Sequence, residues 1–142
     1  MLAYASVPEI LGLGKTEAVS TPMELIDRIE KGLPVTTLFD IAEVVAPNAT
    51  EIVLAIVPKA TLTRRRKEGR LSAAEGAVVA RIAAIWSLAL EVWGTPDAAR
   101  DFLNRPHAML AGRKPIDIVV QSEIGGEMVS QILGRLQYGS AA

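Results

Sequence analysis

The chain lacks cysteine altogether, contains a single histidine, His107, and has aromatic side chains at only 4% of its positions. Without cysteine it forms no disulfide bond and carries no thiolate nucleophile or thiolate metal ligand. A lone histidine offers no histidine-based metal site and little basis for a Ser-His-Asp triad. We therefore expect a protein that is not an enzyme and uses no metal or cofactor, in which His107 is structural or solvated.

A long uncharged apolar run is also missing. The most apolar stretch, residues 76–93, contains Arg81 and Glu91, which leaves nine uncharged residues between them. A membrane-spanning helix needs about 20 such residues. The N-terminus has no basic region followed by an apolar core, which is the pattern of a secretory signal. These absences favour a buried core helix and a cytoplasmic protein.

Helix-start signals recur along the chain, and no segment alternates apolar and polar residues as a half-buried strand does. We expect helices over residues 22–31, 36–46, 51–57, 60–68 and 73–93, with further helices beginning at Pro96, Pro115 and Ser122. The signals are capping residues followed by Glu or Pro: Thr21-Pro22-Met23-Glu24, Asn48-Ala49-Thr50-Glu51, Ser72-Ala73-Ala74-Glu75 and Thr95-Pro96. The fold class is therefore predicted to be all-α.

Residues 51–57 and 60–68 have the dimensions of a helix-turn-helix, and the second helix carries a basic run. If Leu62 faces the core, the rotation of about 100° per residue directs Arg64 and Lys67 outward, with Thr63 beside them. Cations on such a face neutralise DNA phosphates and release counterions. Thr63, Arg64 and Lys67 are therefore candidate DNA-binding residues. The alternative is a solvated helix end, which the negative C-terminal dipole favours.

A charge run and Gly69 precede the fresh cap at Ser72, which places a unit boundary at residue 70. Residues 1–70 form a helix-turn-helix-like unit for DNA binding or dimerisation, and residues 71–142 form a second helical unit. A core of about 70 residues buries apolar helices only partly. We therefore expect a homodimer held by the N-terminal unit.

The predicted helix over residues 73–93 has two apolar stripes, so it should pack on more than one side. One stripe contains Trp86 and Trp93, which we interpret as core residues.

The terminal helix carries an apolar row at every fourth position, namely Ile124, Met128, Ile132 and Leu136. We expect residues 128–133 to pack inward on the central helix. Residues 137–140 follow with little chain left to cover them, so they should form a free tail. Tyr138 supplies a large rigid contact with a polar tip, which suits docking into a cleft of a partner.

The order of these motifs resembles one known family. The cap at Ser72, the helix closed by Trp93-Gly94, the Thr95-Pro96 start, the segment 105–115 and the ending at residues 132–139 follow one another as in the Xre/MbcA/ParS antitoxins. The resemblance covers residues 71–139 and extends more loosely to the N-terminus, and among these antitoxins it favours the ParS type. It implies an Xre-like helix-turn-helix unit packed with a C-terminal toxin-binding domain.

The resemblance further implies an antitoxin of a type II toxin–antitoxin pair. Its partner would be a RES-domain toxin that consumes NAD, by hydrolysis or by ADP-ribosyl transfer. Similar antitoxins place their extreme C-terminus at the active-site cleft of the toxin. Mapped to this sequence, the implied toxin-binding residues are Arg113, Lys114, Arg135, Leu136, Gln137, Tyr138 and Gly139.

Two other classes of function stay open at this point. A stand-alone helix-turn-helix transcriptional regulator would bind its own operator DNA without a partner protein. A small enzyme would have to work without cysteine and with one histidine.

Overall fold

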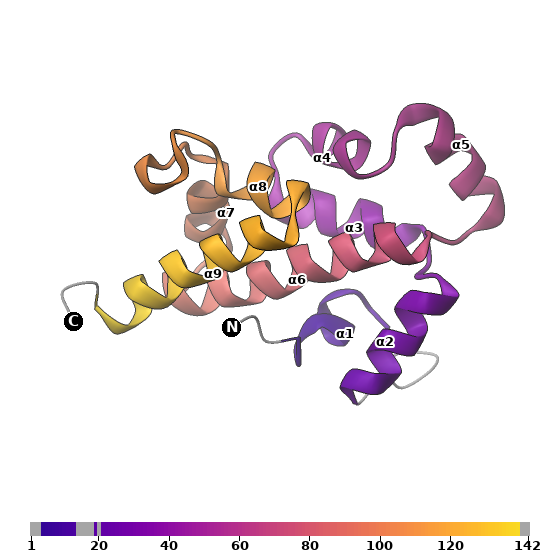
Figure 1. Cartoon of the computed structure of the whole chain (residues 1–142), viewed down its shortest axis with the longest axis horizontal. Coiled ribbons are helices and arrows are strands. Elements are labelled where there is room, and N and C mark those ends of the chain that lie inside the picture. Colours follow the sequence, from indigo (N-terminus) through magenta and orange to yellow (C-terminus); the bar gives the residue numbers. More distant parts are fainter. Residues whose placement is uncertain (1–3, 14–18, 20, 140–142) are drawn as a thin grey trace.

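The computed structural model of the chain describes residues 4–13, 19 and 21–139. These residues form helices and no strand, in agreement with the predicted all-α class. Antiparallel backbone pairing within them is limited to isolated bridges at Pro34–Arg70 and His107–Arg113. In chain order the elements are α1 Val7–Ile10, α2 Pro22–Lys31, α3 Thr36–Val45, α4 Ala49–Ile56, α5 Lys59–Glu68, α6 Ala73–Trp93, α7 Pro96–Asn104, the 3₁₀ turn η1 Ala108–Leu110, α8 Pro115–Gln121 and α9 Glu123–Tyr138 (Figure 1).

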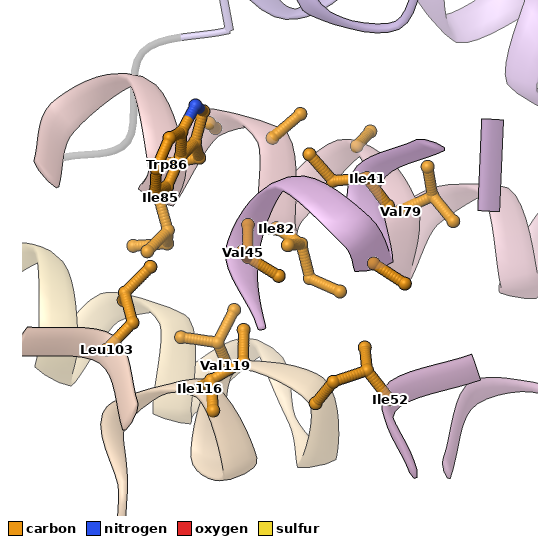
Figure 2. Packing of buried hydrophobic residues seen from close by; sticks show 14 of the residues in the cluster. Ile41, Val45, Ile52, Val79, Ile82, Ile85, Trp86, Leu103, Ile116 and Val119 are labelled. Carbon is orange, nitrogen blue, oxygen red and sulfur yellow. The ribbon is translucent and has the colours of Figure 1, made fainter. Parts of the chain in front are cut away.

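The long helix α6 is the centre of the fold. It packs against α1, α2, α3, α7, α8 and α9. Figure 2 shows Ile82 and Ile85 of α6 gathered with Val45 of α3 and Val119 of α8, and all four are fully buried. Within the described residues α6 is the helix long and apolar enough to cross a membrane. Its packing on several sides makes it instead the core helix that its two apolar stripes predict.

The two tryptophans of α6 differ in burial. Trp86 is buried, whereas Trp93 is 42% exposed. The interpretation of both as core residues is therefore wrong for Trp93, because α6 ends at this residue and few elements remain to cover it. Its ring lies 5.7 Å, centroid to centroid, from that of Phe102 on α7.

Side-chain caps set half of the predicted helix starts. The hydroxyl oxygens of Thr21 and Thr95 each accept a hydrogen bond from a backbone N–H in the first turn, at 3.2 Å. Ser72 and Glu75 form the reciprocal capping box that the sequence predicts. The prediction of Asn48 as a capping residue is wrong. Helix α4 begins directly after it, but the Asn48 side chain makes no capping hydrogen bond.

The two halves of the chain are joined where α7 meets the end of α3. The last carbonyl groups of a helix have no partner within it. Arg100 Nε donates to the carbonyl oxygen of Val44 at 2.7 Å, and the Asn104 side-chain amide donates to that of Val45 at 2.8 Å. The C-terminal half thereby caps a helix of the N-terminal half.

Two glycines allow α9 to approach α8 and α6 closely. A Cβ atom at Gly125 would overlap the carbonyl oxygen of Ile118. A Cβ atom at Gly126 would lie 2.9 Å from Cδ of Arg81. Arg81 in turn donates to the carbonyl oxygens of Val119 at 2.8 Å and Val120 at 3.2 Å, which closes the C-terminal end of α8. This packing fixes which face of α9 points to solvent.

Candidate functional site

The outward face of α9 exposes several apolar side chains, together with the polar Gln131. Ile124 is 74% exposed and Tyr138 is 80% exposed, and Met128 and Arg135 are exposed on the same face. At 100° per residue these four side chains fall within about 80° of one another around the helix axis. The opposite face packs inward through Gly125, Gly126, Val129, Ser130, Ile132 and Leu133.

The predicted inward packing of residues 128–133 is right for Val129, Ile132 and Leu133 and wrong for Met128. A row at every fourth position drifts by about 40° per step, because a helix has 3.6 residues per turn. The row therefore begins on the solvent side at Ile124 and reaches the core at Ile132.

The prediction of a free tail over residues 137–140 is wrong for residues 137 and 138. Residues 137 and 138 belong to α9, and the Gln137 side-chain amide donates to the Glu91 carboxylate of α6 at 2.8 Å. Gly139 then takes a positive φ of 86°, which glycine adopts without strain. Ser140, the last residue of the expected tail, lies outside the described residues. The C-terminal segment is thus a helix end presented in a fixed direction, with Tyr138 pointing away from the core.

A shallow hollow of about 270 Å³ lies beside this helix end. Leu136 lines it from α9, Trp93 from α6, and Phe102 and His107 from α7 and the following loop. Leu136 and Trp93 are both partly exposed. The apolar surface therefore continues from α9 onto the end of α6.

A second hollow, of about 330 Å³, flanks the start of α9. Met109, Arg113, Ile118, Ile124 and Met128 contribute to its lining. Met109 is 55% exposed at the tip of the loop that carries η1. The other wall is formed by α8 and the first turns of α9.

The loop over residues 107–113 is held by its own hydrogen bonds. The His107 N–H donates to the Arg113 carbonyl oxygen, and the Gly112 N–H donates back to the His107 carbonyl oxygen, both at 3.0 Å. His107 Nδ1 accepts from the Met109 N–H at 3.2 Å, so this residue caps η1. The structural role expected for His107 is confirmed. Within the described residues no group of three or more His, Asp or Glu is placed to hold a metal ion.

Cations without carboxylate partners surround the apolar surface. Arg113, Lys114 and Arg135 are exposed, and none of them forms an ion pair in the described part of the chain. Burial raises the pKa of Tyr4. The positive charge of Arg81 opposes this, and the charges of Glu123 and Glu127 at the start of α9 raise the pKa further.

The predicted toxin-binding residues thus fall into two groups. Arg113 and Lys114 lie beside the start of α9, and residues 135–139 lie at its end. At a rise of 1.5 Å per residue, Met128 and Tyr138 are separated by about 15 Å along the helix. The outward face of α9 runs from beside the first group to Arg135 and Tyr138 of the second.

The basic helix α5 is directed as the sequence predicts. Leu62 is buried, and Thr63, Arg64 and Lys67 are exposed. Arg65 instead turns toward α6 and pairs with Glu75 at 2.7 Å, and the Arg66 guanidinium lies 4.8 Å from the centre of the Phe39 ring. Burial alone would raise the pKa of Glu75, but the hydrogen bonds from Arg65 and Ser72 outweigh it and hold this pKa below its usual value.

Comparison with known proteins assigns both halves of the chain. The antitoxin Xre/MbcA/ParS C-terminal toxin-binding domain matches residues 88–139, and the antitoxin Xre-like helix-turn-helix domain matches residues 24–84. The antitoxin Xre of Yersinia enterocolitica is 30% identical over 118 residues, which covers 81% of this chain and 79% of that protein.

The chain belongs to the Xre/MbcA/ParS family of antitoxins. It is therefore a non-enzymatic antitoxin with a C-terminal toxin-binding domain. The α9 face, both hollows and the 107–113 loop all lie within that domain. The two matches meet inside α6, between residues 84 and 88, so both use the central helix.

Around the hollow at the start of α9, sequence reasoning missed three exposed apolar residues of the antitoxin: Met109, Ile124 and Met128. The exposure of Ile124 and Met128 could have been predicted from the row at every fourth position. Each step turns by about 40°, so when Ile132 faces the core, Ile124 and Met128 point away from it. No comparable pattern precedes Met109, whose exposure follows from the fold of the 107–113 loop.

Proposed function

We propose that this antitoxin neutralises a RES-domain, NAD-consuming toxin by covering the toxin's active site with the C-terminal end of α9. The observation that carries the proposal is the outward-pointing helix end formed by Arg135, Leu136 and Tyr138 inside the matched toxin-binding domain. The RES identity of the toxin rests on the family resemblance. A ParS-type assignment stays a prediction, since the similar named protein is an Xre antitoxin.

The chemistry of the helix end suits occlusion of a cleft. Tyr138 presents an apolar ring with a polar tip, and such residues dominate the energy of many interfaces. The contact between Gln137 and Glu91 holds the last turn in place before binding. A pre-ordered element loses less conformational entropy when it binds than a free tail does.

Occlusion predicts competition between the antitoxin and NAD for the toxin. If the helix end and the nucleotide occupy the same cleft, each must weaken the binding of the other by the same factor. This holds whether the toxin hydrolyses NAD or transfers ADP-ribose. We place the pair in the cytoplasm, where NAD is present.

The test uses the cognate toxin and two kinds of variant. Truncation after Gly134 removes the helix end but leaves the buried residues up to Leu133 in place. Neutralisation should collapse, while association with the toxin persists at reduced affinity. The double change Arg135→Ala with Tyr138→Ala, which removes only exposed side chains, should show the same loss of neutralisation with unchanged stability. Full inhibition by both variants would contradict occlusion by this segment.

We further propose that the helix-turn-helix unit binds operator DNA as a homodimer, through Thr63, Arg64 and Lys67. The exposed direction of these side chains favours this role. Exposed apolar residues on the N-terminal helices, Met23 and Leu54, support self-association. Light scattering should give the mass of a dimer, and a monomer at high concentration would contradict this part. Footprinting of the promoter by a chain that associates with no toxin would favour the stand-alone regulator instead.

A further inference from the structure

The hollow at the start of α9 has features of a binding pocket that the occlusion mechanism does not use. Met128 in this hollow lies about 10 Å along α9 from Arg135 and about 15 Å from Tyr138, two of the residues proposed to cover the active site. Its exposed apolar residues are Met109 on one wall and Ile124 and Met128 on the other. Isolated apolar residues on a surface are ordinary, but a group that lines a concavity marks an interaction site.

The walls of this hollow are ordered before any partner arrives. The bridge between His107 and Arg113 closes the loop that presents Met109. The glycine contacts against Ile118 and Arg81 fix the first turns of α9 that present Ile124 and Met128. Binding here therefore requires little ordering of the antitoxin.

Charge around the hollow favours one kind of neighbour. Arg113 lines it and Lys114 follows directly, and both are exposed and unpaired in the described part of the chain. No carboxylate lines this hollow among the described residues, whereas Glu51 and Asp117 line a different one. An acidic partner surface is attracted to this rim, and a basic surface is repelled.

We propose that this hollow is an anchoring pocket for an apolar side chain of the toxin, flanked on the toxin by at least one carboxylate that pairs with Arg113. The proposal rests on the proposed function, because it takes the toxin as occupant of the matched toxin-binding domain. It separates two tasks along one helix. The start of α9 supplies affinity, and the end of α9 supplies inhibition.

The test measures the toxin dissociation constant of single variants of the full-length antitoxin. Met109→Asp and Ile124→Asp place a charge in the hollow at exposed positions, so folding should be preserved. Each should weaken binding by at least about tenfold, as expected for a central apolar contact. Ile26→Asp is the matched control, because Ile26 is 49% exposed on α2 in the N-terminal half. It should change the dissociation constant by less than about twofold.

The charge component is tested with Arg113→Glu. This variant should weaken binding and reduce its dependence on salt, because the paired carboxylate then meets a like charge. At saturating concentrations the Met109 and Ile124 variants should still inhibit the toxin completely, since the helix end is intact. That result distinguishes anchoring from occlusion.

Several other results would overturn the anchoring pocket. Unchanged toxin affinity in the Met109 and Ile124 variants, or an equal loss in the Ile26 control, would overturn the anchoring pocket. A change in the mass of the free antitoxin without a change in toxin affinity would assign the hollow to self-association and overturn it as well. Failure of the wild-type chain to bind any RES-domain toxin would overturn the proposed function and the pocket together, whereas loss of occlusion alone leaves the pocket standing.

Discussion

Helices α5 and α9 both present charged or apolar side chains to solvent, but they differ in how those side chains are used. On α5, Arg65 pairs with Glu75 and Arg66 packs on Phe39, so two of its basic side chains serve the fold. On α9, the outward residues Ile124, Met128 and Tyr138 are largely exposed. Because of these contacts, α5 offers a ligand fewer free basic side chains than its sequence suggests. On α9, more apolar side-chain surface is exposed than the apolar row in the sequence suggests.

Position in the molecule reinforces this difference. Figure 1 shows α5 and the C-terminal end of α9 at opposite ends of the long axis, with α6 between them. A ligand on one helix therefore leaves the other exposed. If both proposals hold, the antitoxin binds operator DNA and toxin at separate surfaces.

The largest effect on stability should follow from Gly125→Ala, which disrupts the packing that directs the outward face of α9. The added Cβ overlaps the Ile118 carbonyl oxygen, so α9 must move away from α8. We expect a loss of about 3 kcal/mol or more in the free energy of unfolding. Gly134→Ala on the same helix is the control, because a Cβ there meets nothing within 4 Å. Chemical denaturation should show this control to be neutral or more stable by up to about 1 kcal/mol.

A smaller loss is expected for Arg81→Met, which removes the donors that cap the end of α8. The carbonyl groups of Val119 and Val120 then lose their side-chain partner, at a cost of about 2 kcal/mol. Thermal unfolding and toxin affinity should both be affected, because α9 packs on the same residues. A stable variant with normal toxin binding would show that Arg81 does not orient α9.

The ion pair between Arg65 of α5 and Glu75 of α6 allows a test of the structural role of the α5 arginines. The folded-state pKa of Glu75 lies below its reference value of 4.5. The stability from its ionised form is therefore present above about pH 4.5 and is lost as pH falls through the folded-state pKa. Glu75→Gln should cost about 1 kcal/mol at pH 7 and weaken the acid dependence of unfolding measured between pH 5 and 3. An identical acid dependence in the variant would rule out this ion pair as its source.

The smallest effects should be those on DNA binding. Arg64 and Lys67 remain exposed, so Arg64→Ala and Lys67→Ala should each weaken operator binding and lower the salt slope by about 1. Arg66→Ala offers a comparison within the same helix, because that side chain already packs on Phe39. Operator binding that is unchanged in the Arg64 and Lys67 variants would identify the basic run as a solvated helix end.

Local signals in the sequence predicted the helices well. Thr21, Ser72 and Thr95 form their capping bonds, and α2 and α6 have the expected bounds. These features depend on residues within one turn of each other, so they are readable from the chain. The direction of the α5 side chains was predictable for the same reason, once Leu62 was placed inward.

The site was less readable because it depends on contacts between distant residues. Gln137 lies in the last turn of α9, where its side chain meets Glu91, 46 positions earlier in the chain. Met109 is exposed because a bridge between His107 and Arg113 closes its loop. Trp93 is partly exposed because the end of α6 extends beyond the helices that cover the rest of it. None of these follows from periodicity alone.

The central claim, that the outward face of α9 is the surface that meets the toxin, is tested most directly by site-specific photo-crosslinking. A benzophenone amino acid would replace Ile124 or Tyr138 in the full-length antitoxin, and Ile26 as a control of similar exposure. The account predicts crosslinks to the toxin from both α9 positions and none from Ile26. Crosslinks from Ile26 with none from α9 would contradict it.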